Sequence, residues 1–80
     1  MNCNCCNRRK RLFESFTTIN DNINICAHCN DVLLKIRDDF NDNNTKANHK
    51  HIDELKELNK KSTPSFLAWF EDYCKKYQLE

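Results

Sequence analysis

Glycine is absent from this 80-residue chain, and proline occurs once, at Pro64. Any left-handed turn must therefore use another residue, and asparagine is the best substitute because its short polar side chain tolerates positive φ. Asn7 and Asn30 each follow a cysteine, and we expect a left-handed backbone at both. An AT-rich genome would also produce a chain rich in asparagine and free of glycine.

Long apolar runs are missing too. No stretch approaches the ~18 apolar residues of a membrane span, and the N-terminus lacks the apolar run of about 7–15 residues found in a secretory signal peptide. We therefore expect a cytoplasmic protein without a membrane partner. Cytoplasmic thiols are kept reduced, so the six cysteines favour metal coordination over a disulfide scaffold.

Neither sign of charge dominates, because 13 Lys and Arg residues face 12 Asp and Glu residues, for a formal net charge of +1. This balance argues against a generally cationic surface for nucleic acid. Hydrophobic residues make up 39% of the chain and charged residues 31%, which suits a folded domain. So short a chain has a marginal core, and a structural metal is a common source of additional stability.

Two Cys-x-x-Cys pairs lie in the first third of the chain. A two-residue gap lets both thiolates of one tight turn reach the same ion, and zinc takes four such ligands at tetrahedral corners. We expect one structural Zn²⁺, held by Cys3, Cys6, Cys26 and Cys29. Two alternatives remain open, since Cys5 could replace Cys3 or Cys6 and His28 could replace Cys26. A closed four-cysteine site leaves no position for water or substrate, so we expect no enzyme.

The predicted fold is small, zinc-stabilised and α+β: a zinc knuckle, a β-hairpin, a second zinc knuckle leading into a helix, and two further helices. The hairpin would run from residues 12–19 through a turn at 20–22 to a strand at 23–25. The helix after the second knuckle would cover about 31–40, with Asn30-Asp31 as its N-cap.

Residues 41–48 are almost free of apolar side chains, and we expect a loop there. The loop would separate a zinc-finger module at 1–40 from a C-terminal helical hairpin at 49–80, packed with that module as one domain. The first helix of this hairpin would cover about 49–61, because apolar residues recur there three apart.

The knuckle, hairpin, knuckle and helix resemble a treble-clef zinc finger, through Cys3-x-x-Cys6, Ile25-Cys26-x-x-Cys29 and the helix that follows. Within that class, residues 3–40 are similar to Gin-type anti-sigma zinc fingers and to small zinc-knuckle proteins of phages and Firmicutes. The resemblance implies a partner in the transcription machinery, such as a sigma factor or polymerase, and a phage origin. The chain departs from the usual pattern by lacking glycine after its knuckles.

A basic run directly follows the first knuckle and consists of Arg8, Arg9, Lys10 and Arg11. A compact basic run can bind phosphates, which makes a nucleic-acid-binding zinc finger the alternative function. The same run could instead be a solvated strand start or a contact for an acidic protein partner. Phosphate binding usually uses a broader basic face than this one.

The last predicted helix begins at Ser62-Thr63-Pro64, where a hydroxyl cap precedes proline at the first helical position, and it continues to about Tyr77. Aromatic residues recur along it at helical spacing. One interpretation places this stripe in the core, packed on the preceding helices. The other exposes part of it, since Trp and Tyr are frequent in binding hot spots. The partner-binding residues would then be Phe66, Trp69, Phe70 and Tyr73.

We therefore expect a small zinc-stabilised protein-interaction module that inhibits or regulates a larger cellular protein, with a second copy of the chain as another possible partner. The remaining reactive side chains have simpler interpretations. Cys74 would be a buried apolar residue. His49 and His51 would be solvated residues at a helix start.

Overall fold

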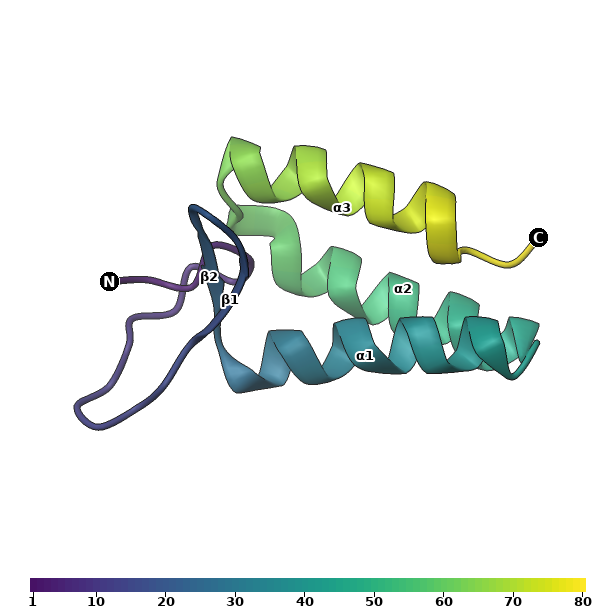
Figure 1. Ribbon diagram of the computed structural model, residues 1–80, viewed down its shortest axis with the longest axis horizontal. Helices are drawn as coiled ribbons and strands as arrows, with labels where there is room; N and C mark the ends of the chain where they lie inside the picture. The colour runs from purple at the N-terminus through teal and green to yellow at the C-terminus, as the bar shows by residue number, and fades with distance from the viewer.

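Two short antiparallel strands and three helices make up the fold in the computed structural model, which describes residues 1–80 (Figure 1). The elements are β1 (Thr17–Asn20), β2 (Ile23–Ile25), α1 (Ala27–Asn41), α2 (Thr45–Leu58), the short 3₁₀ turn η1 (Asn59–Lys61) and α3 (Pro64–Tyr77). The helices lie side by side, and each runs antiparallel to the helix before it. The hairpin and N-terminus lie at one end of the molecule, and the C-terminus lies at the other.

The hairpin is shorter than the sequence predicted. Thr17 pairs with Ile25 and Thr18 with Asn24, and the register then shifts before the turn. Residues 12–16 do not join the strand, because the chain makes a separate turn there with Phe13 at positive φ. The side chain of Ile25 is buried, so β2 is the strand that faces the core.

Helix α1 begins inside the second cysteine pair rather than after it. Cys26 is the N-cap, and the N–H of Asn30 donates to the carbonyl of Cys26 at 3.0 Å, which is the first hydrogen bond of the helix. The expected left-handed backbone and N-cap at Asn30 are therefore wrong, because the second knuckle is itself the first helical turn. The expectation for Asn7 is confirmed, with φ of 63°.

Asparagines make the connection between α1 and α2 much shorter than the loop predicted at 41–48. Asn43 has φ of 59°, and its N–H donates to Phe40 while that of Asn44 donates to Asp39. These two bonds form a Schellman motif, with asparagine where glycine is usual. The Asn44 side chain then caps α2 by accepting from Ala47 N–H at 3.2 Å, so α2 begins at Thr45 and not at 49.

Helix α3 begins as the sequence predicts. The Thr63 hydroxyl accepts from the N–H of Phe66 at 3.3 Å, and Pro64 takes the first helical position. The start of α3 is also tied to the first knuckle, because Thr63 N–H donates to the carbonyl of Asn4 at 3.0 Å. Asn4 pairs with Asn24 of β2 as well, through its backbone N–H and its side-chain oxygen, each at 2.9 Å.

Thirteen buried apolar residues form one core that extends from the cysteine knuckles through β2 into all three helices. They are Cys3, Cys5, Ile23, Ile25, Cys26, Cys29, Val32, Leu33, Ile36, Ile52, Leu55, Phe66 and Phe70. Burying each large side chain contributes about 1.5–3 kcal/mol, so a core of this size gains much from a bound metal.

Candidate metal centre

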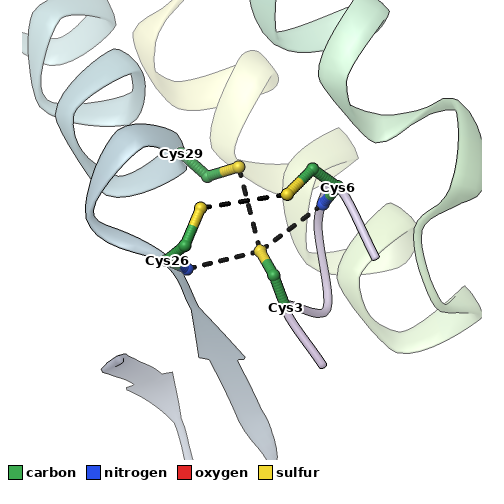
Figure 2. A group of neighbouring side chains, drawn as sticks. All are labelled: Cys3, Cys6, Cys26 and Cys29. Atoms are coloured by element: carbon green, nitrogen blue, oxygen red, sulfur yellow. Dashed lines mark hydrogen bonds between the residues drawn. The ribbon is translucent and has the colours of Figure 1, made fainter. Parts of the chain in front are cut away.

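The four cysteines that the spacing selected converge at the end of the helical bundle (Figure 2). Two come from the N-terminal knuckle and two from the start of α1, and their sulfur atoms all lie within 4.8 Å of one another. The set is Cys3, Cys6, Cys26 and Cys29. All cysteines of the chain are free thiols.

The separations of these sulfurs suit one tetrahedral metal ion. Cys3 Sγ lies 3.8 Å from Cys29 Sγ, and Cys6 Sγ lies 3.8 Å from Cys26 Sγ. A metal–sulfur bond of about 2.3 Å gives a tetrahedron with edges of about 3.8 Å. The site can therefore hold one metal ion with only small side-chain adjustment, and all four ligand positions are then taken by protein.

Backbone amides favour negative charge at Cys3. Its sulfur accepts from the N–H of Cys26 at 3.3 Å and from that of Cys6 at 3.5 Å (Figure 2). The pKa of Cys3 falls to about 4, first through its hydrogen bond with Cys29 and then through these amides. The N-terminus of α1 adds a favourable dipole, because Cys26 caps that helix and Cys29 lies in its first turn.

Cys6 and Cys29 resist ionisation when they have no counter-charge. Burial raises the pKa of Cys6 to about 11, and the hydrogen bond with Cys3 raises the pKa of Cys29 well above its ordinary value. Four thiolates in one buried cluster repel each other unless a cation offsets them. A divalent metal supplies that charge and makes the thiols release their protons.

The two alternative ligands lie outside this cluster. Cys5 is fully buried in the core, yet its sulfur is not among the four that meet. His28 is exposed on the first turn of α1. The structure therefore gives each of them another place: Cys5 is a core residue, and His28 faces solvent.

The basic run is divided by the fold. Arg8 forms an ion pair with Glu14, to which it also donates a second hydrogen bond at 3.0 Å, and its guanidinium lies 5.9 Å from the ring centroid of Phe16. The hydrogen bonds from Arg8 lower the pKa of Glu14 to about 2. Arg8 thus stabilises the conformation of this loop. The three cations after it, Arg9, Lys10 and Arg11, are in no ion pair.

The aromatic stripe of α3 mostly belongs to the core, which corrects part of the predicted partner surface. Phe66 is 0% exposed and Phe70 is 4% exposed, so neither can contact a partner without unfolding. Both belong to the buried core, and their rings stack with centroids 6.0 Å apart on the apolar face that an amphipathic helix must hide. Trp69 remains partly exposed, and its ring stacks on that of Tyr73 with centroids 4.9 Å apart.

Three other predicted residues also have defined places. Cys74 is half-buried, and burial raises the pKa of its thiol. His51 is not solvated as expected, since its Nδ1 lies 2.5 Å from Asp39 Oδ2 between α2 and α1. His49 is exposed and contacts the carbonyl of Leu79.

The structure shows two features that the sequence does not predict. The sequence predicts a loop at Asn48, yet this residue is 0% exposed and joins three segments by hydrogen bonds. It predicts a strand at Leu12 and Phe13, yet they are 84% and 95% exposed at a turn. Their adjacency to the basic run was the available signal for the second feature, but nothing local marked Asn48 as buried.

Comparison with protein-family models, with curated protein sequences and with solved structures finds no match to this chain. These comparisons thus give no support to a relation with Gin-type fingers. No helix of the structure combines the length and apolar character needed to cross a bilayer. The fold and site define a small α+β chain with a four-cysteine cluster able to hold one metal ion.

Proposed function

We propose that the chain is a small zinc-stabilised protein-interaction module that inhibits or regulates a larger cellular protein. The observation that carries the proposal is a shallow groove beside Trp69, where the hairpin turn meets α3. The groove lies in a molecule whose candidate metal centre is closed by four sulfurs. Such a centre suits a structural role, because substrate has no coordination position to take.

Zinc is the metal that the donor set favours. Four cysteine thiolates at tetrahedral separations suit Zn²⁺ or iron, and hard ions such as Mg²⁺ prefer oxygen ligands. Zinc also carries no redox chemistry, which suits a centre whose role is to join two chain segments. A reducing cytoplasm would keep the thiols available for it.

The groove is lined by one aromatic side chain, Trp69, and by two carboxylates that are in no ion pair. It is lined by Asn20, Asp21, Asn22 and Ile23 of the hairpin and by Ser65, Ala68, Trp69 and Asp72 of α3. Asp21 and Asp72 are exposed and take part in no ion pair. A second shallow depression continues past Trp69 toward Tyr73 and Tyr77.

This chemistry fits a protein segment that presents a lysine or arginine beside an apolar side chain. The cation would meet Asp21 and Asp72, and the apolar group would lie on Trp69, a residue type enriched in hot spots. The resemblance of residues 3–40 to Gin-type fingers makes a component of the transcription machinery the first partner to test.

The test inserts a long charged side chain into the groove. Ala68→Arg blocks the groove at an exposed helical position, so it should leave the fold intact and abolish binding. The matched control is Leu67→Arg, because Leu67 is 43% exposed on the same helix and lines neither depression. Partners are captured from lysate in zinc-retaining buffer, identified by mass spectrometry, and then measured as purified pairs by calorimetry.

The expected result is that a purified partner binds the wild type and Leu67→Arg but not Ala68→Arg. Circular dichroism of all three proteins checks that each is folded. Equal affinity of the partner for Ala68→Arg and the wild type would exclude the groove as its binding site.

A further inference from the structure

A tight turn at residues 11–14 projects Leu12 and Phe13 into solvent. The N–H of Glu14 donates to the carbonyl of Arg11 at 3.2 Å, which closes a β-turn with Leu12 and Phe13 at its two corners. Phe13 is 95% exposed and Leu12 is 84% exposed. In Figure 1 this segment extends away from the helices, at the end of the molecule opposite the C-terminus.

The backbone of this turn is unfavourable for the residue it carries. Phe13 has φ of 68°, and a bulky residue in the left-handed region is a conformational outlier. Elsewhere this chain puts asparagine in the same conformation, at Asn7 and Asn43. An exposed phenylalanine that gains no burial from a strained position points to a role for its ring outside the folded chain.

The turn is held in place by the first cysteine knuckle. The residues that lead into the turn pair with the N-terminus. Cys3 N–H donates to the carbonyl of Arg8 at 2.8 Å, and Lys10 N–H donates to that of Met1 at 2.9 Å. Glu14 closes the base by accepting from the N–H of Arg11 at 2.9 Å. A metal at the knuckle would therefore also fix the direction in which the turn points.

The surroundings of the turn are positive. Glu14 is the only acidic residue among the first twenty, and it is taken by Arg8. The neighbouring cations Arg9, Lys10 and Arg11 form no ion pair, and a shallow surface joins them to Met1, Leu12 and Phe13. The other 11 of the 12 acidic residues come after Asn20 in the sequence, so unpaired positive charge is concentrated at this turn.

We infer that this turn is a binding site for single-stranded nucleic acid. Phe13 stacks on an unpaired base, Leu12 packs against the adjacent sugar, and the three free cations contact successive phosphates. Stacking on an exposed aromatic ring with phosphate contacts beside it is a sequence-tolerant way to bind a single strand. This site is separate from the groove at Trp69 and does not depend on the function proposed for that groove.

Single strands fit the turn better than duplexes do. The faces of paired bases are covered by their neighbours, whereas an unpaired base offers a free face to Phe13. Duplex recognition in the major groove normally uses a helix or a β-ribbon, and the first helix of this chain, α1, begins only at Ala27, well after the basic run. The cations here lie on an irregular segment instead.

The first test measures fluorescence anisotropy of labelled oligo(dT) with the zinc-loaded full chain. Neutralising three phosphates of a single strand gives a log–log salt slope of about −2, which is roughly a 20-fold loss of affinity for a fourfold rise in salt. Arg9→Gln, Lys10→Gln and Arg11→Gln together should flatten that slope. Lys50→Gln, at an exposed position on α2, is the matched control and should change nothing.

The second test separates the ring from the fold. Phe13→Asn suits the left-handed backbone and should keep the chain folded while lowering oligo(dT) affinity on the order of tenfold. Phe13→Trp should keep the affinity, and its indole fluorescence should be quenched as it stacks on a base. Ala68→Arg should bind oligo(dT) as the wild type does, so failure of the groove leaves this result intact.

Three results would overturn the inference. One is equal affinity for oligo(dT) and a duplex of the same length, and another is unchanged affinity in Phe13→Asn. The third is sedimentation that shows self-association lost in Phe13→Asn with no binding of oligo(dT), because a second copy of the chain would then cover the turn.

Discussion

The side-chain amide of Asn48 donates a hydrogen bond to the main-chain carbonyl of Tyr77 at 2.9 Å, which fixes the end of α3 against α2. The same amide nitrogen donates to the carbonyl of Ile36 in α1 at 3.0 Å, and its oxygen accepts from the N–H of Leu79 at 2.9 Å. One fully buried side chain in the first turn of α2 therefore joins all three helices. Figure 1 shows the start of α2 at the end of the bundle away from the hairpin.

Asn48→Ala should destabilise the fold by about 1–3 kcal/mol, because it leaves the N–H of Leu79 and the carbonyl of Tyr77 without their partner. Urea unfolding followed by Trp69 fluorescence measures the loss. The matched control is Asn41→Ala at the exposed end of α1, which should change stability by less than about 0.5 kcal/mol. Equal urea midpoints for Asn48→Ala and the wild type would show that this amide does not hold the helices together.

Metal removal should unfold the hairpin and loosen the start of α1. Zinc binding by four thiolates contributes on the order of 10–16 kcal/mol in small zinc domains. The two hydrogen bonds between Asn4 and Asn24, at about 1 kcal/mol each, cannot replace it. A chelator should therefore lower the thermal midpoint sharply, while elemental analysis of the untreated protein should give one zinc per chain.

Cobalt(II) substitution can test which cysteines are ligands. Cys5→Ala should retain the thiolate-to-cobalt absorption of a four-sulfur site, since Cys5 is a core residue outside the cluster. Cys6→Ser should weaken that absorption and the affinity for metal. The opposite pattern would place Cys5 in the coordination sphere and Cys6 outside it.

The cysteine spacing predicted the four thiols that meet, because Cys-x-x-Cys geometry is local, but it left Cys5 and His28 open as replacement ligands. The start of α3 was also predictable, since Thr63 and Pro64 act within one helical turn. The beginning of α1 was not, because the second knuckle can be either a turn before a helix or the first turn of one. Asn30 looked like a cap only on the first of these alternatives.

Positions that depend on tertiary packing could not be predicted. An aromatic stripe at helical spacing is the same whether a core or a partner covers it, so Phe66 and Phe70 were open to both interpretations until the helices were placed. Asn48 has the composition of a loop residue, and its burial depends on carbonyls that are distant in sequence. Positive φ at Phe13 contradicts local preference, and such exceptions are expected at functional positions.

Replacing Phe13 with asparagine should stabilise the fold. A bulky residue in the left-handed region costs about 1–2 kcal/mol relative to residues that adopt it easily, and Phe13 loses almost no buried area when truncated because it is 95% exposed. We expect Phe13→Asn to raise the free energy of unfolding by about 0.5–1 kcal/mol. Leu12→Asn at the neighbouring corner is the control, because it removes a similarly exposed apolar side chain without that strain; an equal gain there would rule out backbone strain as the cause.

Tyr73 should make stability depend on alkaline pH. Its hydroxyl donates to the carbonyl of Leu33 at 2.5 Å, and burial raises the pKa of Tyr73 to about 12. An unfolded tyrosine has a pKa of about 10, so the folded chain holds this proton more tightly. The stability that this proton contributes is fully present below pH ~10 and is lost as pH rises toward ~12.

Tyr73→Phe should be less stable than the wild type by about 1 kcal/mol near neutral pH, and its stability should decline less steeply above pH ~10. Tyr77→Phe keeps Tyr73 and should follow the wild type, and parallel urea midpoints for Tyr73→Phe and the wild type across this range would contradict the assignment.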